Sequence, residues 1–183
     1  SIYETAGANN SITLLFGSIK DTTYIDVDCG WGLDEYELVP AGLDTSDGSA
    51  VWSGTTMTLN VSSAGEVKIY GDPKQFYLAN FDGCYITQID ISKLTELNVL
   101  NLCHNQLEAL DLTPNTKLYA AYLDDNPFNK QPLIVGKNKP DLTILEMGKT
   151  ENLDQSFNLS DYPKMQAFEA YANKGLRKLD PTG

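Results

Sequence analysis

Histidine and cysteine are scarce in this sequence, which limits the chemistry that it can support. His104 is the only histidine, and the cysteines are Cys29, Cys84 and Cys103. An odd number excludes a full disulfide framework, and the cysteine spacings fit no zinc site. One histidine gives no convincing Ser-His-Asp set, and the phosphate-loop, HExxH and GxGxxG motifs are missing from the sequence. We therefore expect no enzymatic activity, no cofactor and no metal centre.

Positive charge is scarce too. The chain has 13 Lys and Arg against 25 Asp and Glu, a formal net charge of −12 and a pI of about 4.3. Such a chain repels phosphate backbones and anionic membrane surfaces, so nucleic acid is not an expected partner. No apolar run approaches the roughly 18 residues that span a bilayer. Residues 1–4 do not start a signal peptide. We expect a protein that does not span a membrane.

An internal repeat is the strongest signal in the sequence. Residues 97–107 read LxxLxLxxNxL, and similar segments begin at residues 76, 118, 142 and 165. Successive starts are 21, 21, 24 and 23 residues apart, inside the range of about 20–29 residues that is typical of leucine-rich repeats. We predict about five coils in residues 76–183, preceded by a different unit in residues 1–75.

The repeat predicts a solenoid. Side chains alternate across a strand, so Leu100 and Leu102 face one side while Val99, Asn101 and Cys103 face the other. One coil cannot bury its own apolar face, so neighbouring coils stack strand beside strand around one continuous core. The expected fold is mostly β, a right-handed leucine-rich-repeat solenoid with irregular or short helical segments on its convex side.

The ninth position of the repeat is expected to form a structural ladder. It holds Cys84, Asn105, Asn126 and Asn173 in four of the coils. The chain turns sharply there, and a buried amide can donate and accept hydrogen bonds at once, which satisfies backbone groups inside the bend. The small thiol of Cys84 fits the same place.

The unit in residues 1–75 lacks the repeat and is predicted to be a small antiparallel β-rich cap on the first coil. Its β-rich runs cover residues 11–19, 23–28, 55–61 and 67–70, and residues 42–48 are rich in turn formers. Asp26 and Asp28 share one strand face near Asp34 and Glu35. They form either a solvated acidic face or, as the alternative, a calcium site.

Two short motifs ahead of the repeats resemble motifs of a known protein family. Residues 25–32 read IDVDCGWG and residues 67–71 read VKIYG, ahead of the repeats. The chain resembles bacterial leucine-rich-repeat proteins of the internalin-like kind, including short secreted or lipid-anchored proteins of Gram-negative gut anaerobes. In those, I-x-I-D-W-G-D-G and then V-x-I-Y-G precede the repeats; here Cys29 replaces Trp and Trp31 replaces Asp. The resemblance implies an exported recognition protein that is extracellular, on the cell surface or periplasmic.

We predict that the concave face is the binding surface, because its outward-pointing side chains are expected not to pack in the core. Its aromatic, amide and carboxylate side chains suit a protein partner, with a glycan as the alternative and a purely structural role in an envelope assembly as a third reading. The candidate ligand-binding residues are Tyr77, Asn80, Asp82, Asn101, Tyr119, Tyr122, Asp124, Glu146, Glu169 and Tyr171.

We also predict the structure of two further segments. Residues 127–140 should form an extended convex loop whose Lys130, Lys137 and Lys139 are either solvated or a docking site. The last strand, near residues 166–170, should be an open edge. Either the basic residues on both sides of it, Lys164, Lys174, Arg177 and Lys178, discourage strand addition there, or the edge pairs with another copy and makes a dimer.

Overall fold

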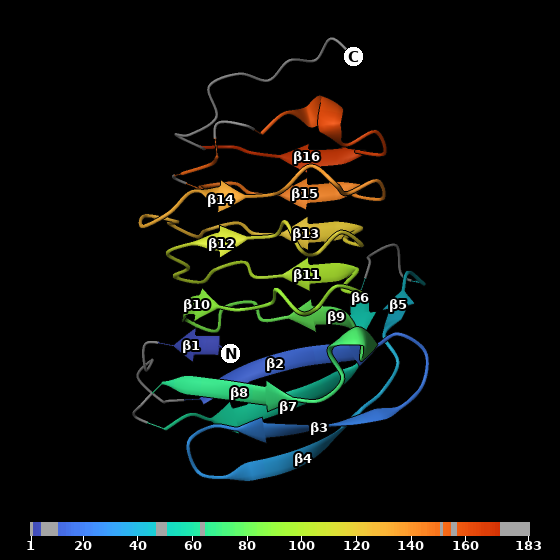
Figure 1. Cartoon of the computed structure of the whole chain (residues 1–183), viewed down its shortest axis with the longest axis vertical. Coiled ribbons are helices and arrows are strands. Elements are labelled where there is room, and N and C mark those ends of the chain that lie inside the picture. The colour runs from blue at the N-terminus through green and yellow to red at the C-terminus, as the bar shows by residue number, and fades with distance from the viewer. Residues whose placement is uncertain are drawn as a thin grey trace.

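The protein is built around one long sheet. The computed structural model describes residues 2–4, 11–46, 51–62, 65–150, 152–154 and 157–172. The long sheet has seven strands in the order β16-β15-β13-β11-β9-β2-β7 (Figure 1). Their bounds are β2 Ser11–Ser18, β7 Thr55–Asn60, β9 Phe76–Asn80, β11 Val99–Asn101, β13 Ala120–Tyr122, β15 Ile144–Glu146 and β16 Ala167–Glu169.

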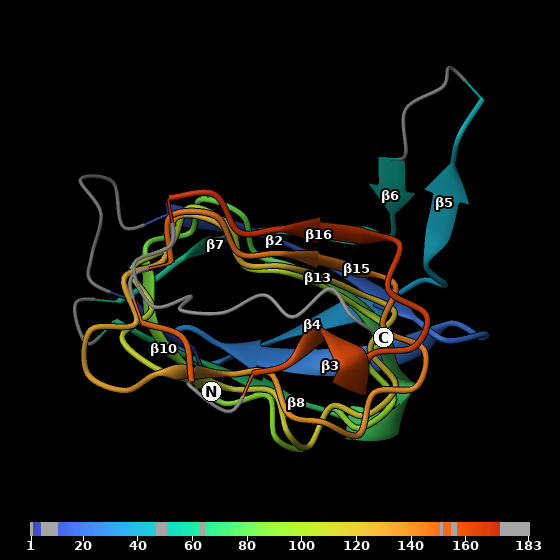
Figure 2. The same cartoon turned by 90° about the horizontal axis from the view of Figure 1, so that it is seen from above.

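A second layer lies opposite this sheet, and Figure 2 shows the two layers from above. It contains a five-stranded sheet in the order β10-β1-β8-β3-β4 and the short pair β12-β14. The strands are β1 Ile2–Glu4, β3 Thr23–Asp28, β4 Leu33–Leu38, β8 Glu66–Tyr70, β10 Ile86–Ile89, β12 Leu110–Asp111 and β14 Leu133–Ile134. The repeat region and the segment that leads into it also contain two short 3₁₀ helices, Pro73–Gln75 and Leu159–Asp161.

The repeat region is a β-solenoid of about four turns, where the periodicity predicted about five coils. The strands β9, β11, β13, β15 and β16 run parallel, with Ala79, Leu100, Ala121, Leu145 and Phe168 side by side. These partners are separated by the same 21, 21, 24 and 23 residues as the sequence repeat. Leu100 and Leu102 are fully buried, so the alternation correctly identified the side of each strand that faces the core.

The N-terminal strands join the solenoid through both layers. β2 pairs antiparallel with β9, and β1 pairs antiparallel with both β10 and β8. One hydrophobic cluster runs without a break from Ile12 to Tyr162. In it, the ring of Phe16 from β2 makes edge contacts with Phe76 and Phe81, at centroid distances of 5.3 and 4.9 Å. The four β-rich runs predicted in this unit are all strands.

Four strands in this unit, β1, β4, β5 and β6, were not predicted. Residues 42–48 were expected to be turn, but Gly42–Asp44 forms β5 and pairs with β6, Val51–Ser53. Figure 2 shows this hairpin standing away from the body on the side of the long sheet. The acidic run Leu33–Leu38 forms β4, the edge of the five-stranded sheet. Its Asp34, Glu35 and Glu37 are exposed, which discourages pairing with another chain at that edge.

Each coil turns away from the long sheet through one left-handed residue. The residue three places after each parallel strand has a φ between 53° and 64°, and these residues are Gly83, His104, Asp125, Lys149 and Ala172. Glycine adopts this conformation freely, whereas other residues lose roughly 1–2 kcal/mol in it. Gly83, His104 and Asp125 are residue types that occur more often in this conformation, whereas at Lys149 and Ala172 the packing of the coils imposes it.

Candidate binding surface on the outer face of the long sheet

The outer face is the side of the long sheet that points away from the shared core. The strand register places one row of five candidate residues across it, one from each parallel strand. The row is Asn80, Asn101, Tyr122, Glu146 and Glu169. All five side chains are at least partly exposed, so the structure brings half of the predicted binding residues into one continuous line.

The outer face is less open than predicted. Leu78, Val99 and Ala120, which the alternation also directs outward, are fully buried. They form a second apolar cluster, against which Leu15, Ala41, Trp52, Tyr77, Tyr122 and Ile144 pack. The prediction that outward-pointing side chains do not pack in a hydrophobic core is wrong for these three residues. Trp52 belongs to β6, so the unpredicted hairpin supplies part of the cover.

Aromatic side chains border this cluster. Tyr77 and Tyr122 are half-buried against it, whereas Tyr119 is exposed and lies outside it. Burial raises the pKa of Tyr122 and the charge of Glu146 raises it further, while a hydrogen bond with Trp52 lowers it. Trp52 and Tyr122 are therefore a fixed pair that joins the hairpin to the third rung of the sheet.

Carboxylates dominate the rest of the face. Burial raises the pKa of Glu146, and the neighbouring charges of Glu169 and Asp124 raise it further. An oxygen of Asp124 accepts a hydrogen bond from the backbone N–H of Gly148. Within the described residues, none of these three carboxylates forms an ion pair with a Lys, Arg or His side chain.

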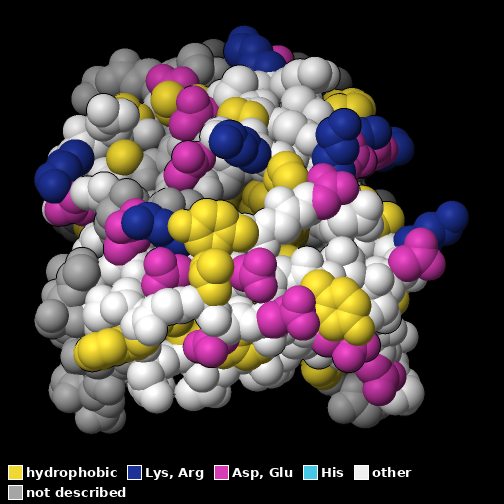
Figure 3. Space-filling view, turned by 60° about the horizontal axis from the view of Figure 1, so that its bottom comes forward, with side chains coloured by type: hydrophobic (Ala, Val, Ile, Leu, Met, Phe, Trp, Pro, Cys, Tyr) yellow, Lys and Arg dark blue, Asp and Glu magenta, His cyan; other side chains and the backbone are white. Residues whose placement is uncertain are grey.

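The return side, opposite the outer face, is different. Figure 3 shows lysine side chains beside Asp and Glu on the upper part of this side. Lys130 pairs with Glu108, Lys164 with Asp141 at 2.6 Å, and Lys137 with Asp161 at 3.5 Å. These three lysines are paired with carboxylates, whereas Asp124, Glu146 and Glu169 on the outer face have no ion pair among the described residues.

Two other candidates lie at the end of the rungs rather than in the row. Asp82 contacts Nδ1 of His104 at 2.8 Å, and Nε2 of His104 lies 3.4 Å from Asp125, which in turn accepts a hydrogen bond from Lys149 at 2.9 Å. The contact with Asp82 raises the pKa of His104. Asp82 and the left-handed turn residues His104, Asp125 and Lys149 thus form a line of alternating acidic and basic side chains. Tyr171 is exposed, and its ring lies over the backbone of the preceding coil.

Gly148 provides that backbone surface. A Cβ atom at Gly148 would lie 2.3 Å from Cε1 of Tyr171, so a larger residue there would displace the ring. The ring of Tyr171, two residues after Glu169, therefore lies against Gly148 at the C-terminal end of the described sheet.

A strand-side ladder, at the ninth position of the repeat, holds successive turns together. The amide oxygen of Asn105 accepts from the N–H groups of Cys84 and Ile86, at 3.1 and 2.9 Å, and its nitrogen lies 2.8–3.0 Å from three carbonyl oxygens. Asn126 repeats this arrangement one coil later, accepting from Leu107 and donating to Leu102 of the preceding coil. Both asparagines are buried.

The ladder changes at its two ends. The thiol of Cys84 donates to the carbonyl oxygen of Thr13 in β2 at 3.2 Å. In the fourth coil, where the sequence pattern is blurred, Thr150 occupies the position, and its buried hydroxyl has no hydrogen-bond partner among the described residues. The predicted Asn173 lies outside the described residues.

A return-side ladder was not predicted. Asn115, Lys139 and Tyr162 are buried at successive intervals of 24 and 23 residues, the intervals of the later strands. Asn115 donates to the carbonyl oxygens of Ile91 and Leu94, each at 2.9 Å. Lys139 donates to Leu112 at 2.6 Å, and Tyr162 donates to Gly136 at 2.9 Å. The repeat interval was the signal that could have revealed it, although the residue types differ.

Lys139 corrects a prediction. It was expected in an exposed basic loop with Lys130 and Lys137, but only 1% of its surface is exposed. Burial lowers its pKa to about 8, and the charge of Asp111 opposes the shift. The other two lysines are exposed and ion-paired, so the three do not form one basic cluster.

The acidic residues considered for calcium are arranged along β3 and β4. Asp26 is paired with Glu35 across the two strands, and Asp34 stands opposite Val27. Asp28 accepts a hydrogen bond from the N–H of Gly30 at 2.8 Å. In the part of the chain that the structure describes, no three His, Cys, Asp or Glu side chains are grouped to hold a metal ion.

Comparison with known proteins identifies no relative. No protein-family model, no curated protein and no solved structure matches the chain. Among the described residues, no helix is both long and apolar enough to cross a membrane.

Proposed function

We propose that this chain is a non-enzymatic recognition module of an exported protein. The proposed class is a right-handed leucine-rich-repeat solenoid, with the N-terminal antiparallel strands as its cap. The 21- to 24-residue coils and the parallel sheet that they form support the class. Export, to the cell surface, the periplasm or the medium, rests on the resemblance carried by residues 25–32 and 67–71. A lipid anchor is part of the same proposal.

The proposed ligand is a protein partner that presents basic side chains to the outer face. The observation that carries this proposal is a group of three carboxylates, Asp124, Glu146 and Glu169, that form no ion pair among the described residues. They lie beside the aromatic pair Trp52 and Tyr122. Complementary charge speeds encounter and selects the partner, while rigid aromatic side chains supply most of the contact energy at protein interfaces.

Charge reversal on two faces tests this proposal. The Glu146→Lys/Glu169→Lys variant should lose partners captured by the wild type from cell-envelope and host extracts. The Asp34→Lys/Glu37→Lys variant carries the same charge change on the β4 edge and should retain them. Equal loss in both variants, or retention in both, would show that the outer face is not the binding surface.

A glycan is the second candidate, favoured by the amides of Asn80 and Asn101 beside the ring of Tyr122 in the same row. A flat ring next to hydrogen-bonding groups suits a sugar. On a glycan array followed by titration, saturable binding should be lost in Tyr122→Ala and kept in Tyr24→Ala, an exposed tyrosine of β3. Sugar binding that both variants retain would contradict this second candidate.

Self-association is a separate proposal. β16 is the outermost described strand of the long sheet, and its outer edge, which pairs with no described strand, offers a place for a second copy. Light scattering at micromolar concentration tests this, and a strict monomer removes the idea.

A further inference from the structure

The β5–β6 hairpin turns an apolar face toward the long sheet. Leu43 and Trp52 are directly paired across the hairpin, and directly paired residues of an antiparallel ladder lie on the same face. Trp52 packs against the buried cluster of the outer face and forms a hydrogen bond with Tyr122. Leu43 therefore lies on the same side of the hairpin as this contact, and 48% of its surface is exposed there.

The part of the outer face next to the hairpin combines aromatic rings with carboxylates. Tyr119, which is 38% exposed, lies beside Tyr122, and Glu146 is paired with Tyr122 on the next strand. Glu169 follows one strand further on. Neither glutamate has an ion pair among the described residues. We call these residues together the hairpin surface, and its members are Leu43, Trp52, Tyr119, Tyr122, Glu146 and Glu169.

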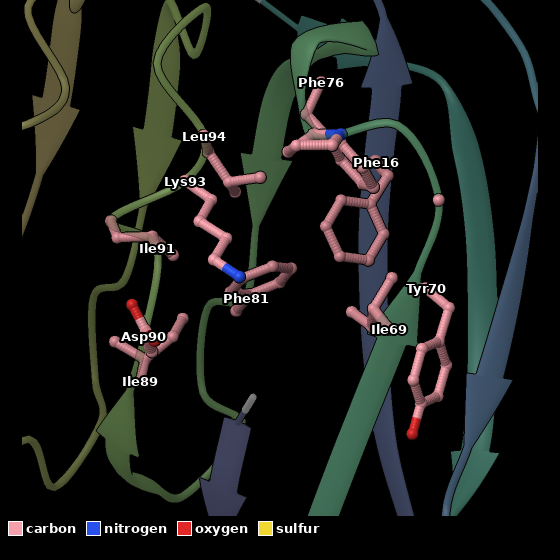
Figure 4. Close-up of a pocket in the computed structure, with 12 residues that line it drawn as sticks. Phe16, Ile69, Tyr70, Phe76, Phe81, Ile89, Asp90, Ile91, Lys93 and Leu94 are labelled. Atoms are coloured by element: carbon pink, nitrogen blue, oxygen red, sulfur yellow. The ribbon is translucent and has the colours of Figure 1, made fainter.

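A second apolar surface lies between the two layers. Figure 4 shows this cavity of about 480 Å³, with Ile69 and Tyr70 on one wall and Ile89 and Asp90 on the other. It lies in line with β1, where residue 1 and any residues preceding it would run, so we assign it no ligand. The hairpin surface is different, because the middle of the chain builds it.

The strands beneath the hairpin surface favour a helix as its occupant. β11, β13 and β15 are each paired on both sides, so a docked segment reaches only their side chains and must satisfy its own backbone hydrogen bonds, as a helix does. Neighbouring strands lie about 4.7–4.9 Å apart, close to the 5.4 Å or so between turns of an α-helix. A helix laid across the strands therefore places successive turns over Tyr122, Glu146 and Glu169.

From this arrangement we infer that the hairpin surface binds a basic amphipathic helix of the partner protein. Its lysines or arginines face Glu146 and Glu169, and its apolar side chains pack against Leu43 and the neighbouring rings. Apolar contacts of this kind supply the affinity of a docked helix, and complementary charge selects it. The inference rests on the function proposed above, because it places the same partner against both the outer face and the hairpin.

The test uses a labelled peptide of about 14 residues, which as a helix is about 21 Å long and spans five parallel strands. It contains only leucine and lysine, with the leucines at helical spacing. Fluorescence anisotropy with the full chain should show saturable binding, and circular dichroism should show that the peptide gains helix on binding. A matched peptide of the same composition, with leucine and lysine in strict alternation, has the period of a strand and should bind at least tenfold more weakly.

Matched variants locate the helical peptide on the protein. Leu43→Ser should weaken its binding about tenfold, whereas Leu33→Ser, which changes another exposed strand leucine, should leave binding unchanged. Glu146→Gln should weaken binding and reduce its salt dependence, and Glu37→Gln, on the exposed edge of β4, should do neither. All variants should melt cooperatively. If Glu146→Gln does not, the exposed Glu169→Gln takes its place.

Three results would overturn the inference. They are the absence of saturable binding by the helical peptide, equal binding of the two peptides, and binding that Leu43→Ser leaves unchanged. Partner capture judges the proposed function separately. If Glu146→Lys/Glu169→Lys loses the captured partners, the outer face stands as the binding surface even when the helix or the hairpin is ruled out. If it retains them, the proposed function fails and the inference fails with it.

Discussion

The two long sides of each coil hold their neighbours by different means. On the strand side, Asn105 and Asn126 do the same work in successive coils, because the left-handed turn has the same shape each time. On the return side, Asn115, Lys139 and Tyr162 do related work with three different side chains. A bend with both donors and acceptors inside demands an amide, whereas a single carbonyl accepts any donor that reaches it.

Coil length explains which donor is used. Asn115 belongs to a 21-residue coil, while the coils leading to Lys139 and Tyr162 have 24 and 23 residues. The longer coils use longer side chains to reach the preceding carbonyl. The return side thus tolerates insertions that the strand side does not, since the strand register is fixed across all five rungs.

The largest change in stability is expected from a mutation in the strand-side ladder. Asn105→Ala removes the acceptor for the buried N–H groups of Cys84 and Ile86, and stranded buried groups cost about 1–3 kcal/mol. Urea unfolding should place this variant near the upper end of that range. Asn98→Ala, which removes a partly exposed amide bonded to Lys117, is the control and should lose much less. A change of a few tenths in Asn105→Ala would reject the ladder.

On the return side, Lys139 should make stability depend on pH. Its pKa is about 8 in the folded protein against 10.5 unfolded, so the folded state binds fewer protons between these values. Stability therefore rises with pH in that window, by about 2 kcal/mol from pH 8 to pH 10. The comparison is with Lys139→Met, measured in parallel by urea unfolding. Parallel curves for the two proteins would contradict the burial of the charge.

Completing the strand-side ladder in the fourth coil should increase the stability, by a smaller amount than Asn105→Ala decreases it. Thr150 occupies the ladder position with an unpartnered hydroxyl, and Thr150→Asn should restore the bridge and add about 1 kcal/mol, the net value of one or two hydrogen bonds. Thr150→Val serves as control, because it removes the hydroxyl without adding an amide. Destabilisation by Thr150→Asn would mean that the longer fourth coil cannot accept the bridge.

The smallest effect is expected at the exposed turn residue His104. Its pKa is raised above 6.5 by Asp82, so its contribution is complete below the unfolded value and is lost as pH rises through the folded one. Because both side chains are largely exposed, the contribution is only a few tenths of a kcal/mol. An NMR titration should give a lower His104 pKa in Asp82→Asn than in the wild type. An unchanged His104 pKa in Asp82→Asn would show that the contact with Asp82 does not raise it.

Much of the fold was predictable from the sequence because repeats constrain each other. The intervals of 21, 21, 24 and 23 residues located all five parallel strands, and alternation identified the core side of Leu100 and Leu102. The candidate row on the outer face followed from the same pattern. The burial of Leu78 and Val99 did not, because alternation tells which side of a sheet a residue faces and not what lies against that side.

Local sequence thus determined the coil, its strand register and its amides, because these depend on patterns that recur within each repeat. Only the tertiary structure decided the rest. The β5–β6 hairpin covers an outward-facing apolar strip, and Lys139 is enclosed by neighbouring coils. Each of these features depends on segments far apart in the chain, whose contact no local pattern records.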